Sequence, residues 1–313
     1  MKKKLLNILR LLRPRQWSKN IAVFAAITFS GRLFELDLFL TVCYAMLIFC
    51  AISSAIYVIN DLFDIKKDKL HPFKRFRPLA HGDVSKSEAI VIATILIVVG
   101  LTASYFINLS FFFIALIYLF LQLSYTLSFK HITVLDVLAL AGGYILRVYA
   151  GEVVSEFHIS VWLLLTTISL SLFLVVAKRR SELTLISQYT SAQIAATRKT
   201  LSHYSERLLD VYAAMFATST FLSYALFTFL VDPKNTNPGS GELINTLFQI
   251  NLDKKWLMLT IVPVVYGLMR YLQDVYEKHE GESPERVVLS DKPLLAAVIL
   301  WGVLVVTIIY FVN

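Results

Sequence analysis

The sequence predicts an all-α polytopic membrane protein, a bundle of nine transmembrane helices that forms one domain over residues 1–313. Hydrophobic residues make up 57% of the 313-residue chain and charged residues only 17%, whereas soluble proteins carry about 25% charged residues. The apolar residues also stand in long blocks, and residues 89–129 contain no Asp, Glu, Lys or Arg. Since about 20 apolar residues cross the hydrocarbon core of a bilayer, this block alone fits two helices.

Hydropathy locates the spans, and the lipid environment favours a helical conformation for them. Helices are expected because an open strand leaves backbone groups unpaired in the bilayer core. The polar tripeptide Asn108-Leu109-Ser110 is expected to separate the third span from the fourth. The nine spans are predicted near Trp17–Phe34, Leu38–Ile59, Ala89–Ile107, Ser110–Phe129, Val134–Ala150, Ile159–Ala177, Leu208–Val231, Trp256–Met269 and Leu294–Val312.

The positive charges orient these spans. With the N-terminus inside, 25 of the 30 Lys and Arg residues fall on the cytoplasmic side and 4 on the other, with Arg147 inside a span. This asymmetry predicts a cytoplasmic N-terminus in the cell (inner) membrane. It also accounts for the net charge of +8, so nucleic acid is not expected as a partner. Two cytoplasmic loops, residues 60–87 and 178–207, stand out by length and polarity, and any site on this side of the bundle is expected to be capped by them.

Three carboxylates follow the second span. If its helix continues past Asn60, then Asp61, Asp64 and Asp68 have i, i+3, i+7 spacing and share one face. Oxygen ligands favour Mg²⁺, which combines carboxylates with waters and substrate phosphates. The alternative is a solvated acidic helix end balanced by neighbouring lysines. At the mouth of a membrane bundle we favour a metal site, because ionisable groups there are functional by default.

A basic stretch comes next. Lys74, Arg75 and Arg77 can bind phosphate oxygens, since guanidinium groups match phosphate geometry. The alternative is anchoring on the cytoplasmic side, which needs positive charge but no particular order. Beside a Mg²⁺ site we favour phosphate binding.

At these residues the chain resembles the UbiA superfamily of intramembrane prenyltransferases. The resemblance rests on Asn60-Asp61-x-x-Asp64-x-x-x-Asp68, followed by Arg77-Pro78-Leu79 and Gly82. It implies a UbiA-like fold, Mg²⁺ dependence and a substrate activated by diphosphate.

A narrower resemblance, to decaprenyl-phosphate phosphoribosyltransferases, covers almost the whole chain. It implies Mg²⁺-dependent transfer of 5-phosphoribose from phosphoribosyl pyrophosphate to a polyprenyl phosphate, giving polyprenyl-phosphoryl ribose 5-phosphate. The product is expected to serve cell wall biosynthesis or, as the open alternative, another lipid-linked sugar. A homo-oligomer is compatible with it. The segments that carry it are Leu12–Asn20, His71–Pro78, Tyr125 with Lys130 and Asp136, Leu146–Gly151, Lys178-Arg179 with Glu182, and Ser283–Leu294.

One departure from the wider superfamily supports this branch. Prenyl-diphosphate enzymes usually carry a second motif of paired aspartates, whereas this region offers only Asp136, with Arg147 farther along. Fewer carboxylates and more cations suit a donor with an extra 5-phosphate. An intramembrane Arg is costly and usually paired, so Arg147 is expected either to contact substrate or to pair with Asp136 or Glu152.

The resemblance implies roles for individual residues. Lys178 and Arg179 are expected to hold the lipid phosphate, with snorkelling to the membrane surface as the alternative. Asp61, Asp64, Lys130 and Asp136 are the expected catalytic residues. The expected substrate-binding residues are Lys19, Asn20, Asn60, Lys74, Arg75, Arg77, Tyr125, Arg147, Lys178 and Arg179, and the expected metal ligands are Asp61, Asp64 and Asp68.

Two other functions remain open. A UbiA-type prenyltransferase would share the fold and the Mg²⁺ site but would move a prenyl group from a prenyl diphosphate to an aromatic or lipid acceptor. A transporter would show paired broken helices in two similar halves. Pro263 can break one span, but the sequence shows no matching break or repeat.

Overall fold

The computed structural model describes residues 2–70, 74–186, 203–230, 256–277 and 284–312, and every regular element within them is helical. The elements, in chain order, are α1 (Lys2–Leu12), η1 (Pro14–Phe24), α2 (Ala25–Phe29), α3 (Leu36–Leu70), η2 (Lys74–Phe76), α4 (Pro78–His81), α5 (Lys86–Ile107), α6 (Leu109–Leu127), η3 (Phe129–His131), α7 (Leu135–Ser155), α8 (Val161–Ile186), α10 (Glu206–Leu230), η6 (Trp256–Thr260), α12 (Ile261–Tyr276), α13 (Pro284–Ser290), α14 (Lys292–Thr307) and η7 (Ile308–Val312).

Eight of these helical stretches, within the described residues, are long and apolar enough to cross a membrane. They correspond to eight of the nine predicted spans and identify the chain as a multi-pass membrane protein. The predicted break at Asn108 is confirmed. α5 ends at Ile107, and the Asn108 side chain caps α6 by accepting a hydrogen bond from the backbone N–H of Phe111 (2.9 Å).

The first predicted span, residues 17–34, differs from the others. It falls mainly on η1, an 11-residue 3₁₀ helix, and on α2, an α-helix of 5 residues. A 3₁₀ helix rises about 2.0 Å per residue and an α-helix about 1.5 Å. Together the two segments therefore span roughly 30 Å, close to the hydrocarbon thickness of a bilayer.

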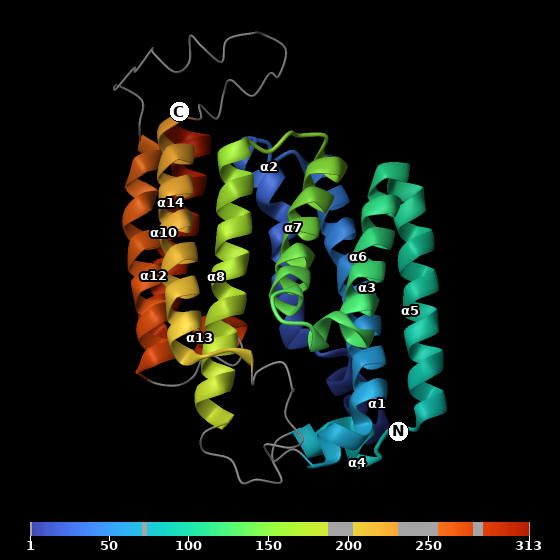
Figure 1. Ribbon diagram of the computed structural model, residues 1–313. Helices are drawn as coiled ribbons and strands as arrows, with labels where there is room; N and C mark the ends of the chain where they lie inside the picture. Colours follow the sequence, from blue (N-terminus) through green and yellow to red (C-terminus); the bar gives the residue numbers. More distant parts are fainter. Residues whose placement is uncertain (1, 71–73, 187–202, 231–255, 278–283, 313) are drawn as a thin grey trace.

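The helices run side by side between two ends of the bundle (Figure 1). We call one the α1 end, where α1 and α4 lie, and the other the α2 end, which also holds the C-terminus of the chain. α3, α5, α6 and α7 form one group of packed helices. α8, α10, α12 and α14 form the other, and α7 packs against α8 to join them.

The segment formed by η1 and α2 packs against α7 and α3 inside the first group. Gly151 of α7 makes this possible, because a Cβ there would collide with the backbone carbonyl of Val23. The outer helices are apolar towards their surroundings. α5, for example, exposes Ile90, Val91 and Ile95, as expected for a surface that faces lipid.

Candidate active site

The three predicted carboxylates lie on the last turns of α3, at the α1 end of the bundle. α3 continues to Leu70, so the expectation that its helix extends past Asn60 is confirmed. Asp61 is 2% exposed and Asp68 is 4% exposed, while Asp64 is partly buried. Buried carboxylates of this kind need compensating charge.

Cations from three separate segments of the chain supply that charge. Arg77, just before α4, donates from Nη1 to Asp61 Oδ1 (3.0 Å) and to Asp68 Oδ2 (2.7 Å). Arg13 also donates to Asp61, and its guanidinium lies 5.1 Å from the ring centroid of Tyr57. Lys130 in η3 donates to Asp64 (2.9 Å). We call Asp61, Asp64, Asp68 and these three cations the carboxylate cluster.

Arg13 is a member of this cluster that the sequence reasoning did not select. It lies between α1 and η1 in a left-handed conformation (φ 54°, ψ 61°), which turns its side chain towards α3 over a sequence separation of 48 residues. The segment Leu12-Arg13-Pro14 was part of the narrower resemblance, and an Arg directly before an N1 proline was the one available indication.

The carboxylate cluster offers two buried carboxylates to a Mg²⁺ ion. In the described part of the chain, no three His, Cys, Asp or Glu residues are placed to hold one ion, and Asp64 is directed to Lys130 rather than to Arg77. Asp61 and Asp68, however, both point an oxygen at one nitrogen atom of Arg77. Mg²⁺ usually takes one or two carboxylates and completes its shell with water and phosphate oxygens. The pair Asp61 and Asp68 therefore fits the ion.

A second polar cluster surrounds Asp136 at the start of α7. Arg179 of α8 donates from Nε to Asp136 Oδ2 (2.8 Å) and from Nη2 to Tyr125 (3.2 Å), and it also contacts Glu182. Tyr204 donates to Asp136 Oδ1 (2.8 Å). Arg179 is fully buried, so its guanidinium does not snorkel to the membrane surface.

Arg147 lies deeper in the bundle. Its guanidinium donates to Asn20 Oδ1 (2.6 Å), to the Gly143 carbonyl (2.7 Å) and to the Tyr118 hydroxyl (2.6 Å). Those contacts are neutral oxygens, so the predicted alternative of an ion pair with Asp136 or Glu152 is not formed. The structure thus brings Arg147 and Asn20 together.

The remaining predicted residues lie around these groups. Lys19 donates to Gln16 (2.6 Å), and Asn60 is partly buried one residue before Asp61. Lys178 lies 4.0 Å from Glu182. Lys74 and Arg75 are in η2, where Arg75 is exposed and stacks on Phe76.

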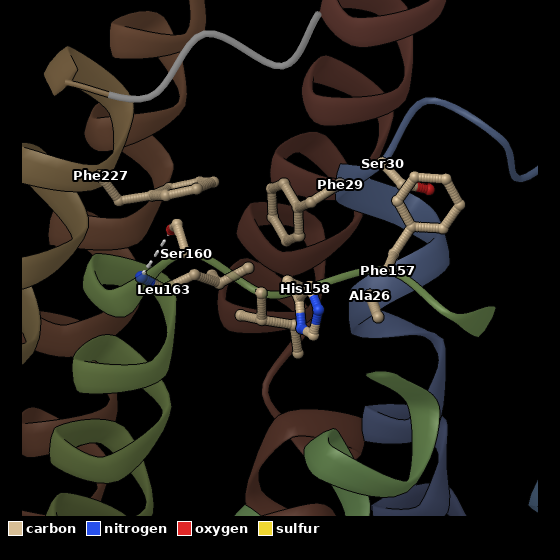
Figure 2. A pocket seen from close by; sticks show the side chains of 9 residues that line it. Ala26, Phe29, Ser30, Phe157, His158, Ser160, Leu163 and Phe227 are labelled. Atoms are coloured by element: carbon tan, nitrogen blue, oxygen red, sulfur yellow. Dashed lines mark hydrogen bonds between the residues drawn. The ribbon is translucent and has the colours of Figure 1, made fainter. Parts of the chain in front are cut away.

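Two hollows lie at the α2 end, away from all predicted site residues. One is a cavity of about 20 Å³, lined by aromatic and small side chains including Phe29, Phe157 and Phe227 (Figure 2). It is just large enough for a water molecule. The other is an open cleft of about 640 Å³ beside Arg32, Glu35 and Glu156. Because no predicted catalytic residue lines them, the carboxylate cluster is the better candidate site.

Comparison with known proteins places this chain in a family. The model described as the UbiA prenyltransferase family matches residues 21–288. The chain belongs to this family. As a UbiA family member it is a membrane-embedded transferase, and the predicted resemblance is confirmed.

Relatives within the UbiA family are similar along most of the chain. The decaprenyl-phosphate phosphoribosyltransferase of Mycolicibacterium smegmatis is 33% identical over 310 residues, which cover 97% of this chain and 93% of the relative. The Corynebacterium glutamicum protein of the same name is 32% identical, with 97% and 87% covered. A UbiA homologue from Archaeoglobus fulgidus, solved with GPP and Mg²⁺, has a TM-score of 0.68 at 18% identity, covering 97% of this chain and 99% of its own. That likeness confirms the fold.

Proposed function

We propose that this UbiA family member transfers 5-phosphoribose from phosphoribosyl pyrophosphate to a polyprenyl phosphate, in a Mg²⁺-dependent reaction that gives polyprenyl-phosphoryl ribose 5-phosphate. The observation that carries the proposal is the carboxylate cluster, where buried Asp61 and Asp68 share the Arg77 guanidinium. The phosphoribosyltransferases similar over nearly the whole chain support the choice of substrate.

Asp61 and Asp68 would hold Mg²⁺, and Asp64 would hold the Lys130 ammonium beside it. When bound, the ion supplies neutralisation of the charge that develops on the departing pyrophosphate. Arg13 and Arg77 bind Asp61, and Lys130 binds Asp64 one turn later on α3; each of these cations can donate hydrogen bonds to phosphate oxygens. The cations thus bind the donor and orient its leaving group.

In the proposed reaction the bond from the anomeric carbon to the pyrophosphate oxygen breaks, and a bond to an oxygen of the lipid phosphate forms from the opposite face. The electron pair of the broken bond leaves with pyrophosphate, and the configuration at the carbon inverts. A phosphate monoester has a second pKa near 6, so the acceptor is mostly a dianion at pH 7. No side chain has to remove a proton from it, and donors directed at the leaving group provide the main acceleration.

The other predicted contacts are assigned by position. Arg147, with Asn20 and Lys19, is proposed to attract the donor's 5-phosphate, because its three hydrogen bonds go to neutral oxygens and its ring contacts are with Tyr118 and Tyr144. Lys178, at the α1 end of α8, is proposed for the lipid phosphate. Arg179 holds Asp136 and Glu182, so we propose that it supports this subsite rather than binding the lipid.

The topology of the proposed enzyme follows from the positive charges and from the path of the chain. η1 and α2 lead the chain from the α1 end to the α2 end. We infer that they form the first span of the chain and so complete the nine predicted crossings. The α1 end, which holds the N-terminus, then lies on the cytoplasmic side of the inner membrane. We propose that residues 1–313 act as one domain in which segments 60–87 and 178–207 cap the site. The structure corrects the expectation that these segments are loops throughout, because α3 continues to Leu70 and α8 to Ile186. Residues 71–73 and 187–202 of these segments lie outside the described residues.

The test is a transfer assay with the purified protein. With Mg²⁺, ribose-labelled phosphoribosyl pyrophosphate and polyprenyl phosphate, label should enter the lipid fraction. Asp61→Asn should lower the rate at least about 100-fold, whereas Asp37→Asn, an exposed carboxylate at the opposite end of α3, should leave it unchanged. If lipid is labelled only when a prenyl diphosphate is the labelled donor, the chain is a prenyltransferase and the proposal fails.

A further inference from the structure

The turn between α6 and α7 carries Lys130 and ends in an unfavourable backbone conformation. η3 holds Lys130, which is 5% exposed. Four residues later, Val134 has φ 70° and ψ −46°. A β-branched residue at positive φ is a genuine outlier, and this region corresponds to a strained γ-turn. Such a conformation persists only when surrounding contacts hold it.

Tyr204 provides those contacts from a distant part of the sequence. Its hydroxyl accepts a hydrogen bond from the backbone N–H of Val134 (2.8 Å) and donates one to Asp136 Oδ1 (2.8 Å). The phenol is 5% exposed, and burial raises the pKa of Tyr204 to about 12. The hydroxyl therefore keeps its proton near neutral pH and can make both bonds at once.

Asp136 and Tyr204 are themselves held by further contacts. Arg179 binds the second oxygen of Asp136 (2.8 Å), and the Tyr204 ring packs with Val137, Val175 and Val176 in a buried apolar cluster. Tyr204 is thus held between α7 and α8. At the other end of the turn, Lys130 donates to Asp64 (2.9 Å).

We propose that Tyr204 is a positioning residue: its hydroxyl holds the turn at Val134 so that the Lys130 ammonium meets Asp64 in the carboxylate cluster. Tyr204 lies too far along the chain for local sequence patterns to connect it with Lys130. The effect of this placement on turnover rests on the proposed function. The placement of Lys130 against Asp64 does not depend on that function.

The turnover test compares Tyr204→Phe with Tyr212→Phe. Tyr212 packs against the same apolar cluster, and among the described residues its hydroxyl makes no hydrogen bond to Val134 or Asp136. Tyr204→Phe should lower kcat about 10- to 100-fold, and Tyr212→Phe should not. In a Lys130→Met background, Tyr204→Phe should add no more than about 2-fold, because both changes remove the same interaction. Additive losses would overturn the proposal.

Hydrogen exchange tests the placement without any turnover. Residues 128–138 should exchange faster in full-length Tyr204→Phe than in wild type or Tyr212→Phe, because the Val134 N–H loses its acceptor. Adding Val134→Gly to Tyr204→Phe should restore slow exchange at residues 128–132, since glycine adopts positive φ without strain.

Unchanged exchange in Tyr204→Phe overturns the positioning role. So does the absence of any rescue by Val134→Gly. If the wild type transfers no phosphoribose but the exchange results are as expected, the proposed function is wrong and the positioning role of Tyr204 stands. If Tyr204→Phe does not fold, Val134→Gly by itself decides: it should leave Lys130 protected from amine-reactive labelling, and faster labelling than in wild type contradicts the proposal.

Discussion

The close approach of Gly151 to Val23 gives the sharpest test of how η1 is held in the bundle. In Gly151→Ala the added methyl group would stand 2.8 Å from the Val23 carbonyl carbon, with the carbonyl oxygen closer still. Ordinary contact begins near 3.4 Å, so α7 and η1 must separate by at least about 0.6 Å at the carbon, and by more at the oxygen. Both groups are parts of helices, and neither can rotate away.

This displacement should reach the site. η1 carries Asn20, which binds Arg147, and follows Arg13, which binds Asp61. We expect Gly151→Ala to lower the free energy of unfolding by about 1–3 kcal/mol and the transfer rate about 10- to 100-fold. The loss of stability is measured by thermal unfolding of the purified protein in detergent, and the transfer rate is measured by the label that enters the lipid fraction.

The matched control is Gly302→Ala in α14, where a Cβ would meet no atom within 4 Å. There the exchange of Gly for Ala inside a helix should stabilise the protein by about 0.5–1 kcal/mol, with unchanged turnover. If Gly151→Ala unfolds at the wild-type temperature and turns over normally, the contact between η1 and α7 is not as described.

Three further predictions concern the two polar clusters. Asp68→Asn should raise the Mg²⁺ concentration for half-maximal turnover about tenfold, because one of two oxygen ligands loses its charge; an unchanged requirement would remove Asp68 from the metal site. Arg179→Met should lower the free energy of unfolding by about 3–5 kcal/mol, because Asp136 is left buried without the cation that balances its charge; an unchanged melting temperature would contradict this. Tyr204 has a folded-state pKa raised to about 12 by burial, so the folded state keeps this proton longer than the unfolded state does. Its contribution to stability should be present below pH 10 and be lost as the pH rises from about 10 to 12, and the melting temperature of Tyr204→Phe should depend less on pH over that range.

Local patterns in the sequence predicted much of the fold. Long apolar blocks located eight of the spans, and the capping ability of Asn108 located the break between α5 and α6. The spacing of Asp61, Asp64 and Asp68 predicted their common face, because α3 keeps its helical period beyond the membrane. These features depend only on residues near one another in the chain.

Contacts between distant segments could not be predicted in this way. Arg13 meets Asp61, and Tyr204 meets Val134 across 70 residues. Neither pairing follows from periodicity, because each depends on how the helices pack. For the same reason Arg179 could be read as a snorkelling residue, although the packing of α8 on α7 buries it against Asp136. The 3₁₀ conformation of η1 was missed because hydropathy does not distinguish helix types.

The most direct test of the central claim is to measure binding of Mn²⁺, as a paramagnetic substitute for Mg²⁺, by electron paramagnetic resonance in the presence of phosphoribosyl pyrophosphate. Wild type should bind the ion together with the donor, and a variant carrying both Asp61→Asn and Asp68→Asn should bind it at least about 10-fold more weakly. Equal affinity in the two proteins would contradict a metal site at the α1 end of α3.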